Sequence, residues 1–163
     1  ENCFAAGVFK KYQCELTEGS HIVLVNPGNM GNMGTIIRTL TGFGLSDLAV
    51  ISPGVDIFDP KVIRASMGAI FKINFKYYDS FNKYQENFKK HKLYTFMLNG
   101  AVSLKDVKHD RNKSFSLIFG NEATGLDNNF AKIGTNVIIK HTERIDSLNL
   151  TIAAGIAMYQ FCS

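Results

Sequence analysis

Cysteine is scarce in this 163-residue chain, and its three copies follow no pattern typical of a bound metal or a disulfide framework. Cys3, Cys14 and Cys162 form no C-x-x-C pair, and their number is odd. We therefore expect neither disulfides nor a zinc site, and the sequence holds no other cluster of metal ligands. This use of cysteine favours a reducing compartment, so we expect a cytoplasmic protein.

Long apolar runs, internal repeats and low-complexity linkers are missing as well. A membrane-spanning helix needs roughly 20 consecutive apolar residues, so we expect no membrane contact. Hydrophobic residues make up 45% of the chain and charged residues 20%, which is typical of one folded domain of this length. The net charge of +4 is compatible with a nucleic-acid partner but does not require one.

Short apolar segments alternate with helical patterns along the chain. We expect strands at residues 21–26, 47–52, 69–75, 93–98, 115–120 and 136–140. Helical patterns occur at residues 33–44, 80–92 and 146–161. This alternation predicts an α/β domain with a mostly parallel sheet and helices on both faces.

Two of the helical patterns indicate what they pack against. The middle one places Phe81, Tyr84 and Phe88 on one face, which predicts packing on the sheet. The last is apolar on nearly every side, so it must be buried in the core or against a partner subunit. Residues 4–9 form one more candidate strand, which is either an edge strand or the tail of a preceding domain.

The glycine-rich segment NPGNMGNMGTIIRTLTGFG, residues 26–44, has the character of a phosphate-binding loop. It is not a Walker loop, because five residues separate Gly28 from Gly34, where the Walker pattern has four, and no lysine follows. It also lacks the G-x-G spacing of the dinucleotide fingerprint. What remains is a strand, a turn and a helix that displays Asn32 at its start and Arg38 almost two turns later.

Both side chains have structural and functional interpretations. Asn32 is suited to cap the helix, which is the common role of asparagine at this place. Arg38 lies among residues that pack, and arginine is rarely buried without a partner. A planar guanidinium near the amides of a helix start suits a nucleic-acid phosphate.

Two further segments place polar residues at the ends of apolar elements. In LIFGNEATGL, residues 117–126, Asn121 and Glu122 follow a buried strand, where ligands bind in open α/β sheets; a helix-capping turn is the alternative. In HTERIDSLNLTIAAGIA, residues 141–157, Ser147 and Asn149 open the last helix, and a cap at Asp146 or Ser147 is the alternative.

Taken in order, N-x-G-x-x-x-R, G-N-E-x-x-G-L and S-L-N resemble the three motifs of the SpoU/TrmH family of RNA 2′-O-ribose methyltransferases, which belongs to the SPOUT class. The resemblance runs from about Val23 to the end of the chain, and Arg64, Ser66 and Gly68 match the segment between the first two motifs. It implies a SPOUT domain at residues 21–163 with a C-terminal trefoil knot. Residues 1–20 would be a linker or the tail of a missing N-terminal RNA-binding domain of a longer protein.

The resemblance also implies the cofactor S-adenosylmethionine and the residues around it. These are expected to be Phe119, Gly120, Asn121, Gly125, Ile139 and Leu148. Gly120 suits the role because a residue without Cβ lets a ligand approach the main chain. Lys140 stands where many relatives have proline, at the rim of this pocket, and we expect the neighbouring His141 to be a solvent-exposed loop residue.

Methyl transfer to a ribose 2′-hydroxyl depends mostly on positioning and needs no metal. By resemblance Arg38 is the catalytic arginine and would act as the base that takes the 2′-hydroxyl proton. The alternative is a phosphate clamp that orients the 2′-hydroxyl, because a guanidinium is reluctant to lose a proton. Asn32 and Glu122 would fix its geometry, while Ser147 and Asn149 would line the substrate side.

The expected partners are RNA and a second copy of the chain. Ribosomal RNA is favoured over tRNA, because the inferred missing domain is commoner among relatives that act on it. A tRNA 2′-O-methyltransferase and a non-catalytic RNA-binding SPOUT relative are the alternatives. A homodimer is expected through the last helix and the knot.

Overall fold

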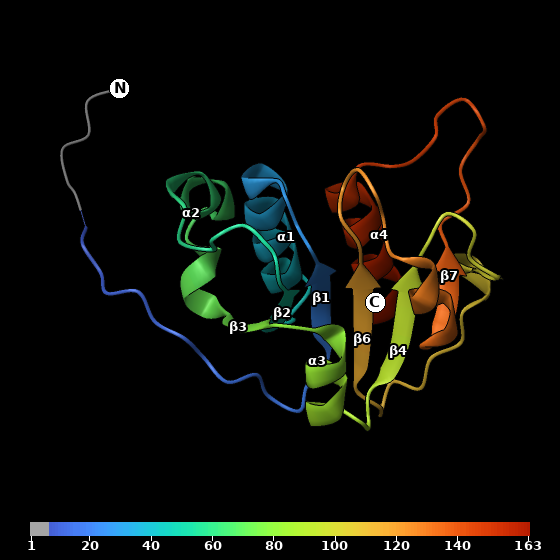
Figure 1. The fold of residues 1–163 in the computed structure, drawn as a ribbon, viewed down its shortest axis with the longest axis horizontal. Coiled ribbons are helices and arrows are strands. Elements are labelled where there is room, and N and C mark those ends of the chain that lie inside the picture. Colours follow the sequence, from blue (N-terminus) through green and yellow to red (C-terminus); the bar gives the residue numbers. More distant parts are fainter. Residues whose placement is uncertain (1–6) are drawn as a thin grey trace.

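The computed structural model describes residues 7–163, and a seven-stranded sheet lies at its centre (Figure 1). The strand order is β3-β2-β1-β6-β4-β7-β5, and all neighbouring strands pair in parallel. The strands are β1 (His21–Val25), β2 (Asp47–Ile51), β3 (Asn74–Tyr78), β4 (Lys92–Phe96), β5 (Val102–Ser103), β6 (Phe115–Phe119) and β7 (Thr135–Ile138). The predicted α/β class with a parallel sheet is confirmed.

Helices cover both faces of the sheet, as predicted. They are α1 (Met30–Gly42), α2 (Pro60–Ser66), α3 (Phe81–Asn87) and α4 (Leu150–Cys162), with 3-10 helices at η1 (Ala69–Lys72), η2 (Leu104–Asp106) and η3 (Asn128–Lys132). Helices α1 and α4 lie side by side on one face, with α2 beside α1, and α3 lies on the other (Figure 1). No helix in the described range is long and apolar enough to cross a membrane.

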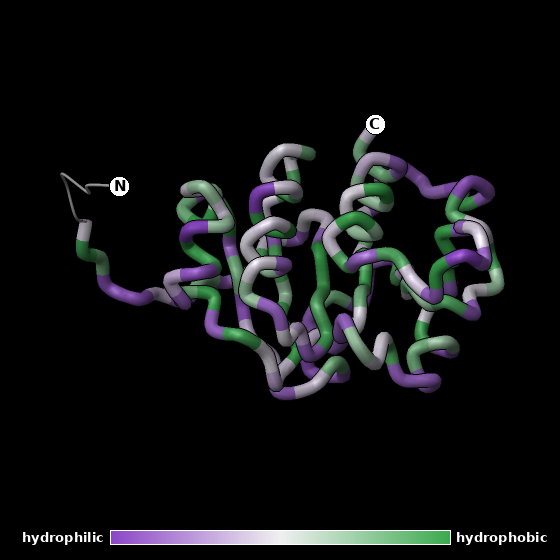
Figure 2. Tube along the Cα trace, turned by 90° about the horizontal axis from the view of Figure 1, so that it is seen from above, coloured by the Kyte–Doolittle hydropathy of each residue, from purple (hydrophilic) through white to green (hydrophobic). Residues whose placement is uncertain are grey.

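The core has two parts, one on each face of the sheet. Side chains alternate along a strand, so in β1 Ile22 and Leu24 join the core under α1 and α4, whereas Val23 joins the core under α3. Figure 2 shows hydrophobic residues along the central strands and hydrophilic residues concentrated in the surrounding loops. The predicted face of Phe81, Tyr84 and Phe88 is confirmed, because all three are buried in the α3 core.

The strand expected at residues 69–75 was wrong in its first half. Met67 and Gly68 have positive φ values of 51° and 83°, so the chain turns sharply after α2 and forms η1 before β3 begins. Ala69 and Ile70 are apolar because η1 packs them into the core beside α1. In the candidate strand at residues 4–9, residues 4–6 lie outside the described range and 7–9 form no strand.

Helix α4 is not buried on every side within this chain. Ala154, Ala157 and Met158 are fully buried, but Ile152, Ile156 and Tyr159 are 54%, 40% and 64% exposed. The sequence left two alternatives for this helix, burial in the core or burial against a partner subunit. The exposed residues show that the core of this chain alone does not bury it, so the first alternative was wrong.

Candidate functional site

A cavity of about 320 Å³ opens at the carboxyl ends of β6, β4 and β7. The rings of Phe96 and Phe119 stack at its base, with centroids 4.5 Å apart and planes 16° from parallel. Residues 119–126, 137–139 and 147–148 form much of the wall. The wall includes all six residues expected at the cofactor: Phe119, Gly120, Asn121, Gly125, Ile139 and Leu148.

Asn121 builds the turn that forms one side of this cavity. Its Oδ1 accepts hydrogen bonds from the N–H groups of Ala123 and Thr124 at 2.9 and 3.2 Å. Its Nδ2 donates to the Asn26 carbonyl at 2.8 Å, which ties the turn to the loop after β1. Gly125 closes the turn with a φ of 68° that favours glycine.

Gly120 is required here for a reason that the sequence did not reveal. A Cβ at this position would lie 2.2 Å from the main-chain carbon of Gly125, so the returning turn occupies that space. The expectation that the missing Cβ leaves room for a ligand was therefore wrong. Glycine at this position lets two stretches of cavity wall pack main chain to main chain.

Glu122 links this turn to the start of α1. Its Oε2 accepts from Gly28 N–H at 3.0 Å, and its Oε1 accepts from Asn29 N–H and from Asn32 Nδ2, both at 3.1 Å. Partial burial alone would raise the pKa of Glu122, but the hydrogen bonds from Gly28, Asn32 and Asn29 hold it below its ordinary value. Glu122 is thus an ionised acceptor that fixes the loop.

Asn32 does not cap α1, so the capping interpretation was wrong. The cap is Asn29, whose Oδ1 accepts from the Asn32 N–H at 3.0 Å. The Asn32 side chain is therefore available for Glu122, and the structure brings these two predicted site residues together.

Arg38 lies on the exposed side of α1, whereas Ile36, Ile37 and Leu40 face the core. The expectation that Arg38 sits among packed residues and needs a buried partner was therefore wrong. It does not line the cavity of its own chain. Its exposure leaves the guanidinium accessible to a ligand.

The two predicted residues before α4 have different places. Ser147 lines the cavity. Asn149 is absent from its wall and instead caps α4, accepting at Oδ1 from the Thr151 N–H at 2.8 Å. The predicted cap at Asp146 or Ser147 was wrong by two or three residues.

Sequence reasoning missed several cavity residues. Phe96 and Asn99 lie at and after the end of β4, where the rule that ligands bind at carboxyl ends of strands would have found them. His141 was expected to be exposed, but it is half-buried and lines the cavity, with Nδ1 bonded to the Ile139 carbonyl at 3.1 Å. That bond turns the ring onto the cavity wall.

Comparisons with known proteins agree on one family. The model of the SpoU rRNA Methylase family matches residues 19–159. A protein of Listeria monocytogenes provisionally named tRNA (cytidine(34)-2′-O)-methyltransferase is 33% identical over 145 residues, covering 86% of this chain and 85% of the relative. The 23S rRNA (guanosine(2553)-2′-O)-methyltransferase RlmP of Bacillus subtilis is 32% identical over 133 residues, covering 79% of this chain.

The chain spans 52% of the length of RlmP, so some relatives carry a further region of similar size. Among solved structures, the AdoMet-bound rRNA methyltransferase of Sinorhizobium meliloti has a TM-score of 0.78 and 27% identity. That match covers 92% of this chain and 57% of the other.

Proposed function

Because the chain belongs to the SpoU rRNA methylase family, we propose that it transfers a methyl group from S-adenosylmethionine to a ribose 2′-hydroxyl of RNA. The observation that carries this proposal is the link between the cavity and the first motif. Glu122 comes from the cavity wall, yet it holds Gly28, Asn29 and Asn32 at the start of α1. A cofactor site and a substrate-facing loop are thereby fixed relative to each other.

The cavity fits the cofactor. Its volume of about 320 Å³ lies within the range of small-molecule sites. The stacked Phe96 and Phe119 with Ile139 and Leu148 offer an apolar slot for a flat base, and polar residues of the wall such as Asn99 and Ser147 offer hydrogen bonds. When bound, S-adenosylmethionine supplies an electrophilic methyl group, and the protein's task is to place the 2′-oxygen in line with it.

Residue roles follow from the positions. Arg38 is exposed and charged, so it suits a phosphate clamp that orients the 2′-hydroxyl better than a base. Glu122 and Asn32 hold the loop that carries the first motif. Ser147 faces the cavity from the third motif, and Asn149 sets the direction in which α4 leaves that loop.

We propose a homodimer through α4. Ile152, Ile156 and Tyr159 are spaced four and three residues apart, so they form one exposed apolar stripe along the helix. This stripe continues to the C-cap of α1, where the ring of Phe43 lies 6.4 Å from that of Tyr159. Because Arg38 does not line its own cavity, such a dimer offers it a route to the cavity of the other copy.

Three finer points are proposals as well. A trefoil knot is supported by the path of the chain after β7, which returns past β4 so that α4 packs on β6 and α1. Ribosomal RNA is the proposed substrate class, as the name of RlmP states for that relative. Transfer RNA is the second candidate, because the match covers 85% of the length of the Listeria relative, which is named for tRNA. An RNA substrate also favours a cytoplasmic location.

Calorimetric titration with S-adenosylmethionine, with ATP and NADH as controls, tests the cofactor site. Transfer of labelled methyl groups to separate pools of unmodified rRNA and tRNA then tests the reaction. We expect selective cofactor binding and labelling of one pool at the ribose. RNA binding without cofactor binding would instead support a non-catalytic relative and contradict the proposal.

A further inference from the structure

Two exposed aromatic rings meet near β3, which is one edge strand of the sheet. The cavity lies in the other half of the sheet, at β6, β4 and β7. Phe9 and Phe71 are 41% and 56% exposed, and their rings lie edge to face with centroids 5.1 Å apart. Met67, four residues before Phe71, is 71% exposed. We call the pair Phe9 and Phe71 the aromatic platform.

The platform is held in place by contacts on its inner side. Phe9 also contacts Phe58, with ring centroids 5.8 Å apart, and Tyr12 lies 5.3 Å from the same ring. The Tyr12 hydroxyl donates to the Ile70 carbonyl at 3.2 Å, next to Phe71. The two rings are therefore presented by packed neighbours.

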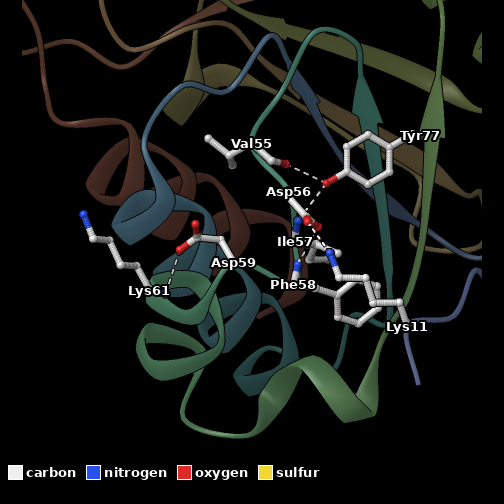
Figure 3. Close-up of polar contacts among 8 residues, drawn as sticks. All are labelled: Lys11, Val55, Asp56, Ile57, Phe58, Asp59, Lys61 and Tyr77. Carbon is white, nitrogen blue, oxygen red and sulfur yellow. Dashed lines mark hydrogen bonds and ion pairs between the residues drawn. The ribbon is translucent and has the colours of Figure 1, made fainter. Parts of the chain in front are cut away.

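A polar network fixes the loop that carries Phe58 (Figure 3). Lys11 Nζ pairs with Asp56 at 2.6 Å and lies 5.7 Å from the centre of the Phe58 ring. The Tyr77 hydroxyl donates to the Val55 carbonyl at 2.6 Å and accepts from the Ile57 N–H at 2.9 Å. Lys11 thus ties the segment that carries Phe9 to this loop.

The surroundings of the platform are positively charged. Within residues 7–163, three carboxylates of the neighbouring segments are engaged: Glu15 pairs with Lys76, Asp56 pairs with Lys11, and Asp59 caps α2. Four cations on the segments that carry or adjoin the platform form no ion pair with another residue in the range 7–163: Lys10, Lys61, Arg64 and Lys72. Aromatic rings framed by free cations are typical of sites for single-stranded nucleic acid.

The same loop also touches the segment just before the first motif. The Val55 N–H donates to the Pro27 carbonyl at 3.0 Å, and the next residue, Gly28, is held by Glu122. Three strand spacings separate β3 from β6, which is roughly 15 Å. A few nucleotides of an extended RNA strand span that distance.

We propose that the aromatic platform stacks unpaired bases of the substrate RNA that flank the methylated nucleotide, while the four free cations contact backbone phosphates. The inference rests on the proposed function in taking RNA as the ligand and in placing the stacked bases beside its methylated nucleotide. A neutral protein partner would use the apolar area but would gain nothing from the free cations, so the charge favours RNA.

The chain contains no tryptophan, so Phe71→Trp introduces a single fluorescent probe into the platform. The matched control is Asn82→Trp, on the exposed side of α3. Titration with a short single-stranded oligoadenylate is expected to quench the platform tryptophan saturably and to leave the control unchanged. A stable RNA duplex, whose bases are already stacked, is expected to quench much less.

A second variant separates stacking from apolar contact. Phe71→Leu keeps an apolar side chain but removes the aromatic face, so oligoadenylate binding measured by anisotropy is expected to weaken about fivefold or more. Unchanged binding by Phe71→Leu, or no quenching of Phe71→Trp, would overturn the platform. Quenching through self-association without RNA would assign the patch to protein contacts and overturn it too.

The outcome is distinguishable from a failure of the proposed function. Cofactor titration and methyl transfer by the wild-type chain test the enzyme independently of Phe71. If the wild type transfers methyl groups but Phe71→Trp is not quenched by oligoadenylate, only the RNA stacking site is rejected. If Phe71→Trp is quenched but the wild type does not bind the cofactor, the platform is supported and the enzyme is rejected.

Discussion

Asn32 and Glu122 are ninety residues apart in sequence and meet at 3.1 Å, where the amide of one donates to the carboxylate of the other. Asn32 lies in the first turn of α1, and Glu122 lies in the turn after β6. The same carboxylate accepts from two main-chain N–H groups of the loop before α1. One ionised side chain therefore fixes the first and second motifs relative to each other.

Glu122→Gln is expected to lower stability and methyl transfer together. Both carboxylate oxygens of Glu122 accept from backbone N–H groups, but a glutamine has only one acceptor oxygen. Its NH2 group would therefore face a backbone N–H and leave that donor without an acceptor. Loss of that hydrogen bond costs about 1–2 kcal/mol of unfolding free energy. Urea unfolding measures this loss, and single-turnover transfer measures the slower methylation.

Asn32→Ala is the matched control for that substitution, because it removes one donor and leaves Glu122 bonded to Gly28 and Asn29. Its loss of stability should be the smaller of the two. If Glu122→Gln proves as stable and as active as wild type, the carboxylate does not organise the site.

Arg38→Ala should abolish methyl transfer while leaving the cofactor in place. Its guanidinium is exposed and does not line the cavity, so the Kd of S-adenosylmethionine is expected to stay within about twofold. A loss of transfer of about 100-fold or more is expected for a clamp on the reacting ribose. Calorimetry and single-turnover kinetics provide the two readouts, and an equal loss of both would contradict the assignment.

Arg38→Lys separates the two possible roles of this side chain. Lysine keeps the positive charge but binds phosphate as a point charge, so a clamp should retain part of its function. A pH-rate profile of this variant that shifts toward the titration of an amine would instead indicate a base.

The regular parts of the fold were predictable because their causes are local. Short apolar runs located most of the strands, and the spacing of Phe81, Tyr84 and Phe88 fixed the buried face of α3. The apolar pair Ala69 and Ile70 was misleading, because its burial comes from packing beside α1. A short apolar run does not reveal which element buries it.

The motifs located the six residues expected at the cofactor, all of which line the cavity, but they did not reveal the contacts that hold the cavity together. The resemblance assigned Asn32 and Glu122 to holding Arg38, but it did not reveal their mutual hydrogen bond, which depends on how β1 and β6 become neighbours. The need for Gly120 depends on where the chain returns at Gly125, and no local pattern contains that information. His141 was missed for the same reason.

Ile156→Asp should dissociate the proposed dimer. Ile156 lies in the middle of the exposed stripe on α4, and a carboxylate there would have to be desolvated in an apolar interface. Light scattering coupled to gel filtration is expected to report a monomer. The control is Ile145→Asp, which adds the same charge at a residue 51% exposed in the loop before α4. A wild-type chain that is already monomeric would reject the interface.

His21 should make the fold sensitive to acid. It is fully buried at the start of β1, with Nδ1 2.9 Å from the Tyr84 hydroxyl and Nε2 2.9 Å from the Thr17 carbonyl. Burial, with a smaller effect of His91, lowers the pKa of His21 from 6.5 to about 4. Between these values the unfolded chain binds a proton that the folded chain does not, so stability falls as the pH drops from 6.5 to 4, by about 3 kcal/mol in total.

The variant His21→Gln tests this titration, because glutamine keeps polar atoms near Tyr84 and Thr17 but binds no proton in this range. It should be less stable than wild type at pH 7, since its hydrogen bonds fit less well. The difference in unfolding free energy should shrink toward pH 4, because only the wild type loses the contribution of His21. Urea unfolding at several pH values measures this difference, and a gap that stays constant would mean that another group, such as His91, causes the acid sensitivity.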